Sequence, residues 1–253
     1  SRRGITGILR SRAAFTSMGM NLREFITNRL DEMAKFPADE VASETIIKLL
    51  GYQWDTVGDS FTIKLAQLLE DHPTKRQCAS RMAETFDPLG LLAPLLVQFK
   101  LFLQDLWIDG LQWKDKIPKD LLPRWEIIRK QFSEVSISIP RMLRPRGDYE
   151  RVHFIVFSDA SKDTYACTTY LLYEYAHGPP KIGLLAAKSK VKPAASTTLT
   201  IPRLELLAIE IGSRIAESAI AAMGTETPST IRFFSDSMVA LYWILRFEQM
   251  KCW

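Results

Sequence analysis

The sequence predicts an α/β fold, and two observations carry this prediction. Residues 148–253 show the order strand, strand, strand, helix, strand, helix, which gives a mixed sheet with one parallel crossover. Residues 71–147 show helical periodicity broken by prolines. Residues 1–70 mix helical and strand patterns. We therefore expect a small α+β part, a helical part and an α/β domain, with the polar run Arg144–Asp148 before the last of these.

In the first part, Phe15–Phe36 is expected to be rich in helix. Two apolar runs, Lys48–Trp54 and Ser60–Leu65, have the composition of strands. The residues between them include Gly58 and Asp59, which favour turns. This pattern predicts a β-hairpin.

The middle part predicts three helices, over Thr74–Phe86, Pro94–Trp107 and Pro118–Phe132. Trp107, Trp113 and Trp125 lie within or between them. Large aromatic side chains contribute most to cores, so we expect these three to anchor the helices rather than to stack on a ligand.

The last part predicts strands over Val152–Ser158, Tyr165–Tyr175, Ile182–Lys190 and Ile231–Ser235, and helices over Pro202–Met223 and Asp236–Phe247. Pro202 is well suited to a first helical turn, and Gly224 to the position after a helix end.

Positive charge is concentrated in two regions, although the net charge is only +4. Residues 1–30 carry six arginines and one acid. Residues 181–203 contain no acid and carry Lys181, Lys188, Lys190, Lys192 and Arg203. Such clusters suit contact with phosphates, and they are also typical of an ordinary solvated surface. Composition alone leaves both alternatives open.

Several kinds of site are disfavoured. The three cysteines, Cys78, Cys167 and Cys252, are far apart and form no CxxC pair, which disfavours a zinc site or a disulfide framework and suits a reducing compartment. The three histidines form no ligand set, and His153 is expected to be structural. There is no Gly-rich phosphate loop, so we expect no small-molecule cofactor. The most apolar stretch, Leu89–Ile108, contains charges and a proline, which favours a buried helix over a membrane span.

Three acids stand where packing does not call for them. Asp159 and Asp236 end two expected strands, and Glu205 lies near the start of the long helix. If the two strands are parallel neighbours, both aspartates leave the sheet at one edge, where α/β sheets bind ligands. Converging carboxylates repel one another, and hard divalent cations relieve that repulsion. The pattern therefore predicts a site for two Mg²⁺ ions, or Mn²⁺, with Asp159, Glu205 and Asp236 as metal ligands.

Each acid also has a structural alternative. Asp236 could cap the helix that follows it. Glu205 could complement the dipole of its helix. The metal site is favoured because all three acids occur together in this order of elements.

The motifs TKRQCASRMAETFDPLGLLAP, LW, IPR, FSDAS, AAKSKV, TLTIPRLEL and FSDS occur in this order. Together they resemble the Pol polyprotein of BEL/Pao-type LTR retrotransposons, over nearly the whole chain. The resemblance implies a reverse transcriptase palm remnant over 1–70, a helical thumb and connection over 71–147, and an incomplete RNase H-like three-layer domain over 148–253.

The resemblance further implies hydrolysis of RNA in RNA–DNA hybrids, with Asp159, Glu205 and Asp236 as the catalytic acids. Asp159 would be shared by both metal ions, and Ser237 would face the RNA 2′-hydroxyl. Lys188, Lys190, Lys192 and Arg203 would contact hybrid phosphates. The expected partners are the hybrid and the rest of the Pol polyprotein, with no membrane. The expected setting is a cytoplasmic particle or the nucleus.

The sequence departs from the pattern in three ways. The polymerase Tyr-x-Asp-Asp box is not in this sequence, and neither are a fifth strand and a fourth RNase H acid. Ala160 follows the first acid where cellular enzymes usually carry Gly. These departures leave open a catalytically inactive remnant that binds nucleic acid or partner proteins. An integrase-type or actin-type relative is disfavoured by the order of the acids and the lack of Gly-rich phosphate turns.

Overall fold

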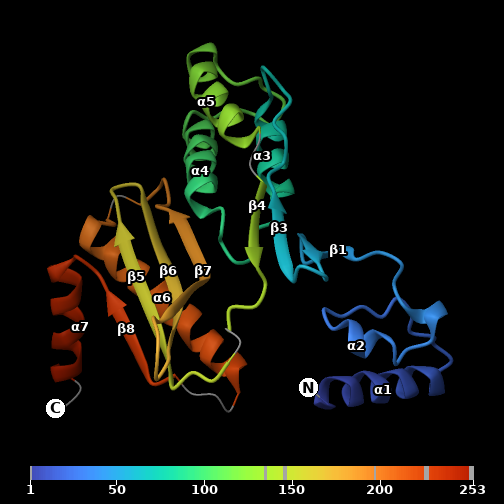
Figure 1. The fold of residues 1–253 in the computed structure, drawn as a ribbon. Coiled ribbons are helices and arrows are strands. Elements are labelled where there is room, and N and C mark those ends of the chain that lie inside the picture. The colour runs from blue at the N-terminus through green and yellow to red at the C-terminus, as the bar shows by residue number, and fades with distance from the viewer. Residues whose placement is uncertain (1, 134–135, 145–146, 197, 225–227, 251–253) are drawn as a thin grey trace. The chain divides into compact units, whose positions relative to one another are not determined.

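The computed structural model describes residues 2–133, 136–144, 147–196, 198–224 and 228–250. The chain forms two compact units (Figure 1). The first contains Ser1–Ile63 and Ser136–Met142, and the second contains Lys64–Val135 and Leu143–Trp253. The predicted division into three domains stays a prediction, and its boundary at Arg144–Asp148 includes two residues outside the described ranges.

The first unit contains α1 (Arg2–Ser17), α2 (Leu30–Met33), the 3₁₀ turn η1 (Ala38–Glu40) and a sheet of β1 (Ile46–Leu49), β2 (Tyr52–Asp55), β3 (Ser60–Lys64) and β4 (Ser136–Pro140) in that order. The expectation that Phe15–Phe36 is rich in helix is wrong, because only the end of α1 and the short α2 fall within it. The helix lies earlier, because the chain turns after Ser17 through Gly19, which has a φ of +74°. The arginine-rich start therefore forms α1, and Arg12 pairs with Glu40 at 2.5 Å.

The predicted hairpin is confirmed as β2 and β3, and a second hairpin precedes it. The run Lys48–Trp54 is not one strand, because Leu50 and Gly51 both take positive φ angles, +48° and +86°. Two such residues form the tight turn that joins antiparallel strands. The turn divides the run into β1 and β2.

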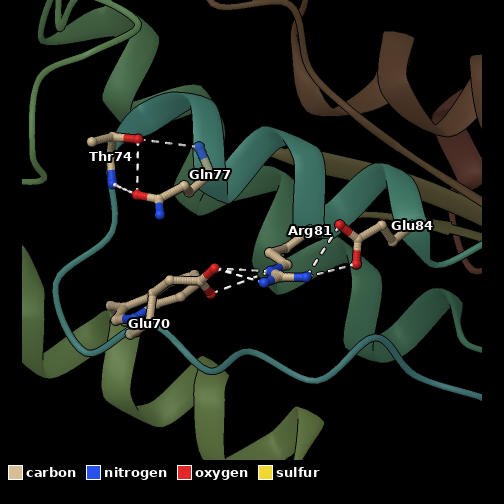
Figure 2. A network of polar contacts seen from close by, with 6 residues as sticks. Glu70, Thr74, Gln77, Arg81 and Glu84 are labelled. Carbon is tan, nitrogen blue, oxygen red and sulfur yellow. Dashed lines mark hydrogen bonds and ion pairs between the residues drawn. The ribbon is translucent and has the colours of Figure 1, made fainter.

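In the second unit the three predicted helices are confirmed, as α3 (Lys75–Glu84), α4 (Ala93–Ile108) and α5 (Leu122–Phe132), with the 3₁₀ turn η2 (Lys119–Leu121) before α5. Thr74 caps α3: its hydroxyl accepts from the Gln77 N–H, and the Gln77 side chain accepts from the Thr74 N–H at 2.8 Å (Figure 2). Phe99 packs edge-on against both Trp125 and Phe132 in the helical core.

Of the three tryptophans expected to be buried, only Trp125 is. Its indole N–H donates to the Glu70 carbonyl at 2.8 Å. Trp107 is 54% exposed and Trp113 is 44% exposed, so the prediction was wrong for both. The helix α4 buries the face that carries Leu106, and Trp107 is the next residue, which lies about 100° further round the helix.

The predicted order of elements is also confirmed in the rest of this unit: β5 (Arg151–Ala160), β6 (Thr164–Glu174), β7 (Lys181–Val191), α6 (Ile201–Met223), β8 (Thr230–Phe234) and α7 (Met238–Met250). The sheet order is β7-β6-β5-β8. Only β5 and β8 are parallel, and β6 pairs antiparallel with both β5 and β7. The helix α6 lies across one face of the sheet, and α7 lies on the β8 side (Figure 1).

The interface between α6 and the sheet is apolar. Alternate residues of β5 and β6 point at the helix, among them Val156 and Cys167, which are buried. At Gly212 the helix comes so close that a β-carbon there would lie 2.6 Å from Val156 Cγ1. The missing side chain therefore sets how near α6 can approach β5.

The outer edge of β7 is covered by the segment that leads into α4. The Ala187 N–H donates to the Leu89 carbonyl at 2.7 Å. Lys100 and Gln104 of α4 donate to the carbonyls of Ser189 and Lys192. Edge strands carry unpaired backbone groups, and here side chains and backbone of the helical segment satisfy several of them.

Two residues of the motif FDPLGLLAP shape this contact. The Asp87 carboxylate accepts from the N–H groups of Leu91 and Leu92, at 2.9 and 2.7 Å, and so holds the turn before α4. Gly90 has a φ of +71°, and a β-carbon there would lie only 1.7 Å from the Ala187 carbonyl oxygen. The motif therefore has a structural basis in the way the turn fits against β7.

His153 is structural, as predicted. It is buried, and its Nδ1 lies 2.7 Å from the Thr230 hydroxyl, which ties β5 to β8. Cys78 and Cys167 are free and buried, and burial raises the pKa of their thiols to about 12 and about 11. Cys252 lies outside the described residues. Across the described part of the chain, every helix is too short or too polar to cross a lipid bilayer.

Candidate metal centre

Three acids from three elements meet at one end of the second sheet. One carboxylate oxygen from each of Asp159, Glu205 and Asp236 lies within 4.8 Å of the others. Asp159 and Asp236 are exposed, and Glu205 is only 5% exposed. The structure thus brings together the three acids that the sequence predicted as metal ligands.

The parallel pairing of β5 and β8 places the two aspartates together. Phe157 of β5 is paired with Phe234 of β8. Asp159 follows Phe157 by two residues, and Asp236 follows Phe234 by two residues. Because parallel neighbours end at the same edge of a sheet, both carboxylates leave it side by side.

Neither structural alternative describes these acids. α6 begins at Ile201 and has no acid in its first turn, so Glu205 is already one turn into the helix, where the dipole is weaker. At α7 the capping side chain is Ser237, whose hydroxyl accepts from the Ala240 N–H at 3.3 Å. Capping therefore falls to Ser237 and not to Asp236.

Electrostatics at Glu205 are unfavourable to its charge. Burial raises the pKa of this carboxyl, a hydrogen bond from the Ala160 backbone opposes the rise, and the negative charges of Asp159 and Asp236 add to it. One of its oxygens, Oε2, is buried and has no hydrogen-bond partner among the described residues. Buried polar atoms are normally satisfied, so this oxygen calls for a ligand.

These donors fit a hard divalent cation. All three offer carboxylate oxygens, the ligands that Mg²⁺ and Mn²⁺ prefer. A bound cation would partner the orphan oxygen of Glu205 and offset the mutual repulsion of the three acids. The described part of the chain brings no histidine or cysteine into the cluster, so the donor set does not resemble that of a zinc site.

An open hollow of about 510 Å³ lies beside the cluster, on the sheet face opposite α6. Asp159 and Asp236 form part of its wall. Phe157 and Phe234 also line it, with their rings stacked at 5.1 Å. The exposed acids therefore face a space that a large ligand can enter.

The predicted basic residues lie apart from the acids. Lys188 and Lys190 are exposed on β7, two strands from Asp159, and they pair with Cys167 and Tyr165, which pack toward α6. Their side chains therefore lie on the face of the sheet that α6 covers. Lys192 follows the end of β7.

Arg203 is nearer to the acids in sequence. It is exposed in the first turn of α6, two residues before Glu205, and its guanidinium donates to the Thr198 carbonyl at 2.9 Å. Sequence reasoning assigned Trp107 of α4 to the core and to no binding site, whereas its side chain is exposed. Its position one residue after the buried face of α4 was the only signal for its exposure.

The fold and the acid cluster define a class: an RNase H-like domain, with a mixed sheet, a helix across one face and acids at the ends of two parallel strands. Residues 74–237, well over half of the chain, match the family model described as the Pao retrotransposon-like RNaseH-like domain. The chain belongs to this family, which confirms the resemblance to BEL/Pao retrotransposons.

Solved structures show a weaker likeness. The foamy viral protease-reverse transcriptase designated dRH, in complex with double-stranded DNA, is 14% identical with a TM-score of 0.43, and the match covers 83% of this chain and 37% of that one. A structure of the foamy viral protease-reverse transcriptase without that designation, also in complex with double-stranded DNA, is 17% identical with a TM-score of 0.19, and the match covers 76% of this chain and 36% of that one. The chain thus spans little more than a third of these relatives. No curated protein matches.

Proposed function

We propose that this chain carries the RNase H-type nuclease part of a retrotransposon Pol polyprotein, which hydrolyses the RNA strand of RNA–DNA hybrids with Mg²⁺. One observation supports this most: Asp159, Glu205 and Asp236 each place a carboxylate oxygen within 4.8 Å of the others, and Glu205 also has a buried oxygen with no hydrogen-bond partner among the described residues. Such an arrangement is costly unless a cation joins it. The family supplies the context of retrotransposon nucleic acid.

Asp159, Glu205 and Asp236 would hold two Mg²⁺ ions, with Mn²⁺ as a substitute. The bound metal would supply an activated water and stabilise the leaving oxygen of a phosphodiester. The chain itself fixes the ligands. The Ala160 N–H orients the Glu205 carboxylate, and the paired ends of β5 and β8 set the spacing of the aspartates.

The remaining residues would position the hybrid. Arg203 and the lysines Lys188, Lys190 and Lys192 would contact phosphates, which set register and orientation but carry no sequence information. Ser237 accepts a hydrogen bond from the Ala240 N–H and keeps its own hydroxyl hydrogen for the RNA 2′-hydroxyl. RNA-containing duplexes are recognised largely by shape and by this group.

The test is cleavage of a hybrid labelled separately on its RNA and DNA strands, in Mg²⁺ and in Mn²⁺. Asp159→Asn should abolish cleavage of the RNA strand and leave the fold unchanged. Asp163→Asn is the matched control, because Asp163 is an exposed acid in the turn after β5 and lies outside the cluster. Equal activity of the two variants would overturn the assignment.

The alternative of an inactive remnant has its own outcome in this test. A wild-type chain that binds the hybrid with steep salt dependence, yet cleaves neither strand in either metal, would replace the nuclease proposal with that of a binding protein.

A further inference from the structure

A groove between α4 and the end of β7 has features that the acid cluster does not explain. It lies wholly within the second unit and has a volume of about 680 Å³, within the range of sites that hold small organic ligands. Lys100 and Lys190 line it, and none of its described lining residues is acidic. The exposed indole of Trp107 forms part of the wall, with Tyr165 and Pro193. Its occupant should be both anionic and flat.

Trp107 is held in place by its neighbours. The ammonium group of Lys75 lies 3.4 Å from the centroid of the ring, and it also donates to the Leu111 carbonyl at 2.7 Å. Lys75 is only 2% exposed, so a buried ammonium group lies against one face of the exposed Trp107 ring. Trp113 meets the same ring edge-on at 5.1 Å. An aromatic ring fixed in advance loses little entropy when a ligand stacks on it.

The groove lies at the same end of the sheet as the acid cluster. Ala160, which follows Asp159, pairs with Tyr165 of β6, and Tyr165 pairs with Lys190 of β7. Two strand spacings separate Ala160 from Lys190, about 10 Å between their α-carbons. Lys190 and Tyr165 lie on the α6 side of the sheet, whereas the hollow beside the acids lies on the opposite face, so the two are separate surfaces at one end of the sheet.

We propose that this groove binds unpaired nucleotides of a single-stranded nucleic acid, with a base stacked on Trp107 and the backbone phosphate held by Lys190. Aromatic platforms beside a basic track are the usual means of binding single strands, and stacking accepts any base. Lys100 adds positive charge at the wall, while its ammonium group donates to the Ser189 carbonyl at 3.2 Å. The inference goes beyond the proposed nuclease function and does not depend on it.

The experiment measures binding alone. The full chain is titrated, in the presence of a chelator so that nothing is cleaved, with dye-labelled oligothymidylate of about ten nucleotides. A blunt RNA–DNA hybrid of the same length is titrated in parallel. Fluorescence anisotropy gives affinity, and quenching of tryptophan emission reports stacking.

Trp107→Ala should weaken single-strand binding on the order of tenfold and remove most of the quenching, with a much smaller effect on the blunt hybrid. Trp107→Phe keeps a ring and should keep most of the affinity. Trp243→Ala is the matched control, because Trp243 is exposed on α7, away from the groove, and its loss should change nothing. Circular dichroism of each variant establishes that it is folded.

The phosphate contact is tested by salt. Lys190→Gln should lower the slope of log affinity against log salt for the single strand by about 0.7, the value for one phosphate contact. Lys181→Gln, at the opposite end of β7, should leave the slope unchanged. The inference is overturned if Trp107→Ala binds the single strand like wild type, or loses affinity for single strand and hybrid equally. Neither result bears on whether the acid cluster cleaves RNA.

Discussion

Gly212 of α6 lies against Val156 of β5 so closely that a β-carbon at position 212 would stand 2.6 Å from the valine Cγ1. Glycine in a helix interior costs about 1 kcal/mol relative to alanine. That cost is offset here by a close approach of the helix to the sheet. The approach also carries Glu205, two turns earlier on α6, toward Asp159.

Gly212→Ala should therefore destabilise the protein, although alanine is the better helix former. Val156 is buried and branched at Cβ, so it has no free rotamer to yield. We expect a loss of about 1–3 kcal/mol in the free energy of unfolding, measured by urea titration. Gly7→Ala is the control: Gly7 lies in α1 with nothing within 4 Å, and there the substitution should be neutral or stabilising. A stable Gly212→Ala variant would contradict the close packing.

Gly90→Ala should detach the turn before α4 from the edge of β7. A β-carbon at position 90 would overlap the Ala187 carbonyl, at 1.7 Å. Gly110 shares nearly the same φ, +70° against +71°, but has open space around it. Gly110→Ala therefore carries the backbone penalty alone, about 1 kcal/mol. The urea midpoint of Gly90→Ala should fall clearly below that of Gly110→Ala. Equal midpoints would mean that the contact with β7 contributes nothing.

Glu205→Gln should have opposite effects with and without metal. Without metal, removal of the charge relieves the repulsion from Asp159 and Asp236, so the melting temperature should stay the same or rise. With Mn²⁺ at roughly 100 times its dissociation constant, the wild-type chain should gain about 2.7 kcal/mol of stability, and the variant should gain much less. Differential scanning fluorimetry measures both. An equal gain in both proteins would place the metal elsewhere.

The pair of Glu70 and Arg81 should make stability depend on pH. The Arg81 guanidinium donates to the Glu70 carboxylate at 2.7 Å and also contacts Glu84 (Figure 2). These hydrogen bonds lower the pKa of Glu70, against the opposing effect of burial. A carboxyl whose pKa is lower in the folded protein contributes stability that is fully present above its unfolded pKa, about 4.3, and is lost as the pH falls through the folded value.

Glu70→Gln removes this contribution, so its unfolding midpoint should vary less with pH than that of wild type as the pH is lowered below about 5. Glu84→Gln is the comparison. Its ion pair with Arg81 is more exposed and spans three residues of one helix, so the variant should follow the wild-type curve more closely. Identical curves for wild type and Glu70→Gln would show that the pair does not contribute.

Much of the fold and the acid site could be predicted from local pattern. Strand ends can be read from sequence, so Asp159 and Asp236 could be placed at one edge once the parallel pairing was assumed. The position of Glu205 was harder, because it depends on how closely α6 approaches the sheet, and a lone Gly212 in a helical pattern does not reveal what it contacts. The place of Glu205 in the site rested on the order of the three acids along the elements and on the assumption that the helix packs across the sheet.

Other features had no local signal. β4 is a short strand that belongs to a sheet whose other strands lie more than seventy residues earlier in the sequence, so its pattern alone did not identify it. Leu50 in a left-handed conformation is unusual for its residue type, which hid the turn between β1 and β2. Trp125 lies on the buried face of α5, whereas Trp107 lies just outside the buried face of α4. The sequence pattern did not fix the rotation of either helix about its axis closely enough to tell a buried tryptophan from an exposed one.

Because the edge of β7 is covered, a further strand can pair with the sheet of the second unit only on its other side. With Leu89, Lys100 and Gln104 hydrogen-bonded along β7, a further strand cannot be added beside β7 without first displacing α4. Among the described residues, β8 has no strand on its other side. Any strand that extends the sheet, from this polypeptide or another, must therefore be added beside β8, within reach of Asp236.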